Sequence, residues 1–302
     1  SRQELTNSVQ RYLGEAPKSV AAEAPKAIIA PHAGYVYSGA LAGQVHATLR
    51  PAAKRIERVV LLGPAHWVAF NGLAAPDCDA FETPLGSIAV DRAAIEAISD
   101  LPGVALRDDA HRDEHALEVQ LPFLQDILER FTLVPLVVGQ CDAAAVAAVL
   151  DRLWGGPETL IVISSDLSHF EDYDAARRID DATAAAIEDL RPERIEAHQA
   201  CGRLPIAGLL TVARRRGMTV KRVGLCNSGD TAGDRDRVVG YGSWRLDEPG
   251  PLDDETLLQR HGAEFRRVAD APIRPGLATG NPTALEHATS PDATSAPATR
   301  LV

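Results

Sequence analysis

Short, continuous apolar runs recur between about residues 26 and 246, and stretches with helical periodicity separate them. Apolar runs of this length, bounded by Pro or Gly, are typical of strands that are covered on both faces of a sheet. Their alternation with helices predicts a single α/β domain with a central, mostly parallel or mixed sheet flanked by helices. The predicted strands include 27–30, 59–62, 132–139 and 159–164, and the predicted helices include 114–130, 144–154 and 175–190.

Two local signals refine the predicted helices. Ser38 is expected to cap a helix whose apolar residues Leu41, Val45 and Leu49 recur every four positions. Pro122 interrupts the pattern over 114–130 and predicts a kink or a break, because proline removes a helical hydrogen bond and clashes with the preceding turn.

The character of the chain changes after residue 246. Residues 247–253 form a linker rich in Pro, Gly and acids, 255–268 have the pattern of one helix, and 282–302 are mostly Ala, Thr, Ser and Pro. A segment with so few large apolar side chains buries too little to offset the entropy of ordering. The sequence therefore predicts one domain over 1–246, followed over 247–302 by a linker, one potential helix and a disordered tail.

Three of the predicted strands are followed within a few residues by a histidine. His32 follows the strand at 27–30, His66 follows 59–62, and His169 follows the strand at 159–164. The carboxyl ends of parallel strands share one edge of an α/β sheet, where ligands bind. A single histidine there is commonly a turn residue bonded to backbone, but three predict a metal site, an acid/base site or both.

The segment SSDLSHF carries a candidate proton-transfer group. It places Asp166, Ser168 and His169 directly beyond a very apolar strand. A serine nucleophile is disfavoured, because Ser168 and His169 are sequence neighbours and no GxSxG motif is present. The pattern favours a histidine that moves a proton and is oriented by a nearby carboxylate.

A further pair, His111 and His115, has i, i+4 spacing. On one helix the two side chains would share a face and could bind a metal, although such pairs are commonly solvated surface residues. The motif is not HExxH, because Arg112 stands where that motif needs Glu. Glu114, His115 and Glu118 are candidate polar groups of a pocket.

Two of the four cysteines are candidate ligands. Cys201 precedes a helix expected to begin at Pro205, and the positive end of a helix dipole would lower the pKa of the thiol and favour the thiolate. Cys226, which follows another strand, is a rival that the residues alone do not exclude. Cys78 and Cys141 lie in acidic loops and are interpreted as bystanders.

Bulk properties narrow the class of protein. A net charge of −11 argues against a nucleic-acid partner, and no apolar run reaches the length of a membrane span. A signal peptide has a basic region followed by an apolar one, and the N-terminus shows no such pattern. Four cysteines without a CxxC pair in 302 residues indicate reduced thiols rather than a disulfide framework. These features predict a cytoplasmic protein.

Six ordered motifs between about residues 26 and 246 resemble the Memo family, whose prokaryotic members are called protein B of the AmmeMemoRadiSam system. The resemblance implies the fold of the class III extradiol dioxygenases, with a metal site at one edge of the sheet. It also implies AMMECR-type and radical-SAM proteins of the same system as partners. The motifs are PHAGYVYSG, GPAHW, DEHALEVQLPFLQ, SSDLSHF, CGRLPI and NSGDTAGDRDRVVGYGS.

The resemblance implies a role for each matching position, and it favours Cys201 over Cys226. His111 falls outside the family pattern and is interpreted as a surface residue. The implied metal ligands are His32, His66 and Cys201; the implied catalytic residues are His169, His115 and Asp166; and the implied substrate-pocket residues are Tyr35, Trp67, Glu118, Asn227 and Asp230.

One departure limits what the resemblance implies about activity. The dioxygenases hold iron with two histidines and a carboxylate, whereas a thiolate would stand here, and sulfur is softer and can itself be oxidised. We expect a mononuclear Fe(II) or copper protein, with zinc as an option, acting as a redox or oxygenase-like enzyme on a small molecule or peptide. Competing interpretations are a non-catalytic metal- or peptide-binding protein and a metal-dependent hydrolase.

Overall fold

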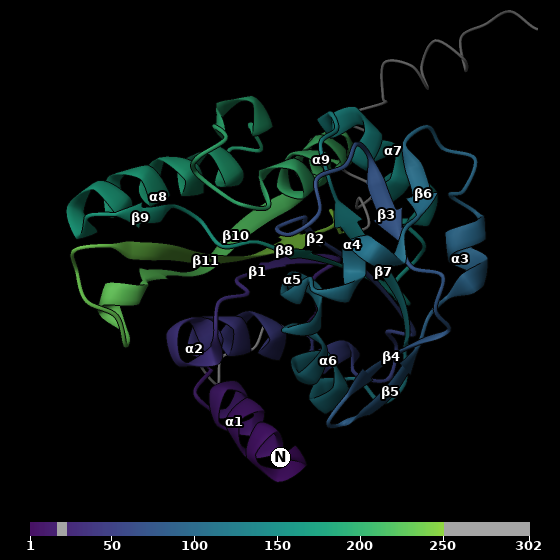
Figure 1. Ribbon diagram of the computed structural model, residues 1–302, viewed down its shortest axis with the longest axis horizontal. Coiled ribbons are helices and arrows are strands. Elements are labelled where there is room, and N and C mark those ends of the chain that lie inside the picture. Colours follow the sequence, from purple (N-terminus) through teal and green to yellow (C-terminus); the bar gives the residue numbers. More distant parts are fainter. Residues whose placement is uncertain (17–22, 251–302) are drawn as a thin grey trace, which may run out of the picture. The chain divides into compact units, whose positions relative to one another are not determined.

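The computed structural model describes residues 1–16 and 23–250 of the chain. A mixed sheet runs through the centre and helices lie on both of its faces, so the predicted α/β fold is confirmed (Figure 1). The helices are α1 (Arg2–Gly14), α2 (Tyr35–Ala47), α3 (Arg92–Glu96), α4 (Asp108–Arg112), α5 (His115–Glu118), α6 (Leu121–Ile127), α7 (Ala143–Leu153), α8 (Tyr173–Glu188) and α9 (Arg203–Arg216). Short 3₁₀ helices are η1 (Arg50–Ala52), η2 (Pro192–Arg194) and η3 (Ser228–Asp230). The strands are β1 (Ala27–Ala30), β2 (Arg58–Pro64), β3 (Leu73–Ala75), β4 (Ala80–Thr83), β5 (Gly86–Ala89), β6 (Val104–Leu106), β7 (Thr132–Val138), β8 (Thr159–Ser164), β9 (His169–Glu171), β10 (Thr219–Asn227) and β11 (Val238–Asp247).

The strand order of the main sheet is β10-β11-β1-β8-β2-β7-β3-β6, and β9 also pairs with β11. Strands β1, β8, β2 and β7 are parallel neighbours, whereas β11 is antiparallel to β1 and β3 is antiparallel to β7. Ala30, the last residue of β1, is in register with Ser164, the last residue of β8. The carboxyl ends of β1, β8 and β2 therefore meet at one edge, and the segments that leave them are brought together there.

The core consists of two apolar layers, one on each face of the sheet. Alternate residues of the central strands face α3, α7, α8 and α9 on one side. The intervening residues face α2, α4, α5 and α6 on the other side. Because both faces are covered, β1 and β8 are buried along their whole length, which explains why their sequences are continuously apolar.

Helix α1 packs on the outer side of α2 and α6 (Figure 1). Two glycines of α2, one turn apart, allow the close approach. A Cβ atom on Gly39 would lie 2.7 Å from the ring of Tyr12, and one on Gly43 would lie 2.6 Å from the Tyr12 backbone. The small residues of this helix therefore set the distance between α1 and α2.

Several local predictions differ from the structure. Gly34, in an extended conformation, precedes the first residue of α2, while the Ser38 hydroxyl donates to the Ala33 carbonyl inside the helix, so Ser38 is not the cap. The helix predicted over 114–130 is two helices, α5 and α6, and Pro122 occupies the first turn of α6, where its missing N–H costs nothing. Likewise α9 begins at Arg203 rather than at Pro205.

The chain beyond residue 250 lies outside the described residues. The linker beyond that point, the helix predicted over 255–268 and the tail over 282–302 fall there, so the predicted domain boundary stays a prediction. Within residues 1–16 and 23–250, no helix is long and apolar enough to cross a membrane.

Candidate metal centre

Three neighbouring strands deliver the polar residues of the candidate site. His32 lies two residues after β1, His66 two residues after β2, and Asp166 two residues after β8, which separates the other two strands. The ring centroids of His32 and His66 are 5.3 Å apart. The parallel arrangement of these strands thus explains the recurrence of histidines after apolar runs.

His32 is held in one orientation by a buried network. Its side chain is 2% exposed, and its Nδ1 lies 2.9 Å from the Ser164 hydroxyl. That hydroxyl donates its only hydrogen to the Ala116 carbonyl at 2.6 Å and accepts from the Gln120 amide at 2.8 Å. Its remaining lone pair must therefore accept from Nδ1–H, because the hydroxyl has no second hydrogen to give. The Nε2 lone pair of His32 is consequently available to a metal.

His66 is oriented by a buried carboxylate. Its backbone N–H and its Nδ1 donate to the two oxygens of Glu114 at 2.7 and 2.8 Å, and Ala116 N–H donates to the same carboxylate at 3.0 Å. Burial alone would raise the pKa of Glu114, but these hydrogen bonds lower it to about 2. The permanent carboxylate keeps the proton on Nδ1 and leaves Nε2 of His66 as the free ligand atom.

His115 completes a cluster of three histidines. Its ring stacks on His66 with centroids 5.0 Å apart, and potential ligand atoms of His32, His66 and His115 lie within 4.8 Å of one another. His32 is buried, whereas the other two are exposed. The predicted partner of His115 is not on the same helix: His111 belongs to α4, is partly buried, and donates from Nε2 to the Ala74 carbonyl. The option of a shared helix face therefore does not apply, and His111, interpreted as a surface residue, is in fact partly buried.

Cys201 lies just before α9 and contacts the buried side of the cluster. Its Sγ is 3.4 Å from His32 Nε2 and accepts a hydrogen bond from Asp166 N–H at 3.3 Å. Burial and the Asp166 carboxylate raise the pKa of the thiol to about 12. The prediction that the helix dipole lowers this pKa is therefore wrong, because desolvation of the thiolate outweighs the dipole. Binding of a metal would supply the missing positive charge and release the proton.

The spacing of His32 Nε2 and Cys201 Sγ fits a metal ion, whereas Cys201 lies outside the group of ligand atoms that are all within 4.8 Å of one another, so His66 would have to move toward the thiol on binding. A nitrogen at about 2.0 Å and a sulfur at about 2.3 Å from a tetrahedral metal lie about 3.5 Å apart. The distance of 3.4 Å between His32 Nε2 and Cys201 Sγ matches that edge. The histidine cluster can likewise hold a metal ion, with a looser spacing that rotation of the exposed rings would close.

Asp166 and His169 lie on the segment that leaves β8. Asp166 is 4% exposed and accepts from the His32 and Ala33 N–H groups at 2.8 and 3.3 Å. Burial raises its pKa to about 6, although those hydrogen bonds and the nearby His169 oppose the rise. His169 Nδ1 donates to the Leu167 carbonyl at 2.8 Å, which leaves its Nε2 as a proton acceptor. Next to it Phe170 has a left-handed φ of 63°, a costly conformation for a bulky residue.

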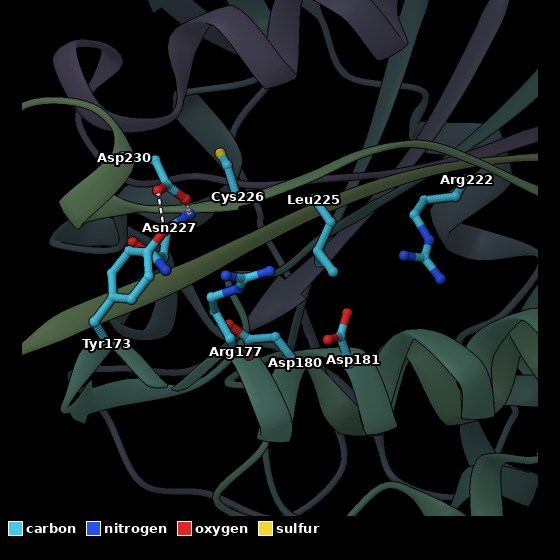
Figure 2. A pocket seen from close by; sticks show the side chains of 9 residues that line it. All are labelled: Tyr173, Arg177, Asp180, Asp181, Arg222, Leu225, Cys226, Asn227 and Asp230. Atoms are coloured by element: carbon cyan, nitrogen blue, oxygen red, sulfur yellow. Dashed lines mark hydrogen bonds between the residues drawn. The ribbon is translucent and has the colours of Figure 1, made fainter. Parts of the chain in front are cut away.

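The residues implied for a substrate pocket lie in different places. Trp67 is 68% exposed beside His66, and Glu118 is exposed on α5. Tyr35 packs against Tyr12 and Phe123 between helices. Asn227 and Asp230, together with the rival thiol Cys226, line a separate groove between α8 and β10 (Figure 2). These assignments remain predictions.

Two residues of the centre were missed by sequence reasoning. Ser164 and Gln120 are fully buried: the Ser164 hydroxyl bonds to His32, and the Gln120 amide donates to that hydroxyl. Both residues stand in motifs whose histidines carry the stronger chemical signal. Glu114 was considered a pocket residue, whereas it anchors His66. A polar residue at the last position of an otherwise apolar strand, as at Ser164, is the signal that could have identified such a partner.

A histidine cluster and a thiol lie where the parallel strands of the α/β sheet end. This arrangement places the chain among proteins with a candidate mononuclear metal centre. The chain belongs to the Memo family, because the sequence model of that family, described as Memo-like protein, matches residues 1–245. A MEMO1 family protein of Aeropyrum pernix is 36% identical over 269 residues, which cover 82% of this chain and 95% of that protein. One from Aquifex aeolicus is 37% identical over 254 residues, covering 80% and 92%. The solved structure of uncharacterized protein JW3007 from Escherichia coli K12 matches 74% of this chain and all of that chain, with a TM-score of 0.49 and 15% identity.

Proposed function

We propose that this protein is a mononuclear metal-dependent enzyme of the redox or oxygenase-like type. The observation that supports it most directly is the pair formed by His32 Nε2 and Cys201 Sγ, 3.4 Å apart, with His66 beside it. A thiolate combined with two imidazoles suits iron or copper better than hard ions such as Mg²⁺ or Ca²⁺. Such a metal would supply electron transfer at the site.

The residues around the metal ligands have separable roles. Ser164 and Glu114 keep the protons of His32 and His66 on Nδ1, so that both Nε2 atoms face the cluster. The Asp166 carboxylate accepts from the His32 and Ala33 N–H groups, and the Asp166 N–H donates to Cys201 Sγ. Asp166 would therefore orient both ligands. His169 would accept or donate the proton that the reaction moves, because its Nε2 is not tied to the backbone.

The exposed side of the cluster would admit the substrate. His66 and His115 are exposed, as is Trp67, which follows His66 in the chain, whereas His32 is buried and Cys201 is partly buried. Three protein ligands leave open positions on a metal, as catalytic sites require. His115 then serves either as a further ligand or as a polar group that contacts the substrate.

Metal substitution tests the ligand set. The metal-free protein would be loaded with Co²⁺, whose thiolate charge-transfer absorption reports a cysteine ligand. Cys201→Ser should lose this absorption, while Cys226→Ser, the matched control, should keep it. His115→Ala should retain the absorption, and its affinity for Co²⁺ should be unchanged or somewhat lower. Persistence of the thiolate band in Cys201→Ser, or its loss in Cys226→Ser, would contradict the proposed ligands.

Turnover tests the reaction class. Protein purified and analysed for metal under anaerobic conditions, then loaded with Fe(II) or copper, should consume O₂ in the presence of catechol-like compounds. His169→Ala should abolish most of this consumption without loss of metal. Amide hydrolysis that depends on zinc alone would replace the proposal with a hydrolase, and tight metal binding without turnover would replace it with a binding protein.

A further inference from the structure

A cavity of about 350 Å³ lies between α8 and β10, where the helix does not close on the edge of the sheet (Figure 2). Its floor on the helix is a polar stripe: Tyr173, Arg177, Asp180 and Asp181 recur at helical spacing and face the strand. A helix that packs on a sheet normally presents apolar side chains there. This groove has the volume of a small-molecule site.

Asp180 is the unusual member of the groove. Its side chain is 2% exposed, yet within residues 1–16 and 23–250 no basic nitrogen lies within ion-pair distance of it. Its Oδ1 accepts from Ser168 N–H at 3.0 Å, the Ser168 hydroxyl also lies close enough to lower its pKa, and no other residue in that part of the chain donates to the carboxylate. Burial raises the pKa of Asp180 to about 6. A buried carboxylate without a counter-ion is costly, so a cation in the groove would relieve that cost.

The groove contains other charges, some paired and some not. Arg177 also lines it, is exposed, lies 5.8 Å from the centroid of the Tyr173 ring, and has no ion-pair partner in the described part of the chain. Arg222 forms a two-pronged ion pair with Glu188 at 2.5 and 3.1 Å. Asp230 accepts from the Tyr173 hydroxyl at 2.5 Å. Asp181 is exposed at the mouth and has no ion-pair partner in the described part of the chain. Two carboxylates, Asp180 and Asp181, outnumber the one unpaired guanidinium of Arg177, so this end of the groove carries a net negative charge.

The arrangement favours an organic cation over a metal ion. In the part of the chain that the structure describes, only His32, His66 and His115 bring three potential ligand atoms within 4.8 Å of one another. The carboxylates of the groove therefore do not converge on one ion. A protonated amine needs no such convergence, since its three N–H donors can reach one carboxylate and the neighbouring polar atoms.

We propose that the groove between α8 and β10 binds a small aliphatic amine, with its ammonium group on Asp180 and its chain along Leu225. This site is distinct from the histidine cluster. It is nevertheless linked to it, because the carboxylate that receives the ammonium also holds the N–H of Ser168, whose neighbour is His169. Asp180 lies on the helix wall and Leu225 on the strand wall of the groove, with Arg177 drawn between them (Figure 2).

Calorimetric titration of the full chain tests the proposal. Butylamine and putrescine should bind at neutral pH and low salt, whereas butanol, which has no charge, should not. Asp180→Asn keeps an oxygen for Ser168 N–H but removes the charge, and should weaken amine binding about tenfold or more. Asp174→Asn changes an exposed acid of the same helix that does not line the groove, and should leave binding unchanged.

A second variant covers the case in which Asp180→Asn does not fold. Asp181→Lys places a cation at the mouth of the groove on an exposed helical position, and should abolish amine binding. Binding that persists in both Asp180→Asn and Asp181→Lys would assign the amine to the metal centre and overturn the proposal. Equal binding of butanol and butylamine, or no heat from either amine, would overturn it as well.

Discussion

Removal of the Ser164 hydroxyl should weaken metal binding although Ser164 is not itself a ligand. In Ser164→Ala the ring of His32 loses the acceptor that keeps its proton on Nδ1 and its Nε2 toward the cluster. Partners of this kind, which orient a metal-bound histidine, typically contribute about 10–100-fold to metal affinity. We therefore expect the dissociation constant of the metal to rise by about that factor.

The same substitution should also destabilise the metal-free fold. Ser164 is fully buried, and its hydroxyl makes three hydrogen bonds. Gln120 keeps a second acceptor, the Pro31 carbonyl at 3.0 Å, but the Ala116 carbonyl and His32 Nδ1–H lose the hydroxyl. At about 1–3 kcal/mol for each unpaired buried group, the free energy of unfolding should fall by about 2–6 kcal/mol.

Two measurements separate these effects. Competition against a chromophoric chelator gives the metal affinity, and urea unfolding of the metal-free protein gives stability. Ser243→Ala is the matched control, because Ser243 is also fully buried but its hydroxyl has no hydrogen-bond partner among the described residues, so its removal should change neither quantity much. Metal affinity equal to that of the wild type in Ser164→Ala would refute the argument that this hydroxyl orients His32.

Three further predictions concern other parts of the molecule. His169→Ala should keep its metal, measured by elemental analysis, while turnover falls by about 10²–10⁴; loss of metal would make His169 a ligand. His46 is fully buried, and burial lowers its pKa to about 4, so stability should be lost as the pH falls from about 6.5 to about 4. By linkage the loss between about pH 7 and about pH 5 is about 2 kcal/mol, and urea unfolding of metal-free His46→Leu should lack that part of the slope. Gly43→Ala should destabilise by about 1–3 kcal/mol, because its Cβ would meet the Tyr12 backbone at 2.6 Å, whereas Gly14→Ala, with open space around it, should not; a more stable Gly43→Ala protein would contradict this.

The central fold was predictable because its signal is local. Strands β1 and β8 are buried on both faces and read as continuous apolar runs, so their predicted bounds agree with the structure. The positions of His32 and His66 after two such runs then placed them at one edge, since parallel strands end together. The pattern did not reveal that β8 lies between β1 and β2. This order depends on pairing between strands that are far apart in the sequence.

Other features depended on tertiary packing and were not accessible from local patterns. The thiol of Cys201 sits before a helix, as expected, but the segments packed around it remove water and reverse the direction of its pKa shift. His111 and His115 have helical spacing, yet the chain breaks between α4 and α5. The polar stripe at Arg177 and Asp181 reads as a solvated helix face until the neighbouring strand β10 turns it into the wall of a groove.

The candidate metal centre combines a buried half, formed by His32 and Cys201, with an exposed half, formed by His66 and His115. His32 is locked by Ser164 and Asp166, and Cys201 is held by the Asp166 N–H, so this half is set before a metal arrives. His66 and His115 are exposed, although the buried Glu114 carboxylate also fixes the ring of His66. Substitutions of the proposed ligands His32, Cys201 and His66 should therefore alter metal affinity, whereas His115→Ala should chiefly alter which molecules reach the metal.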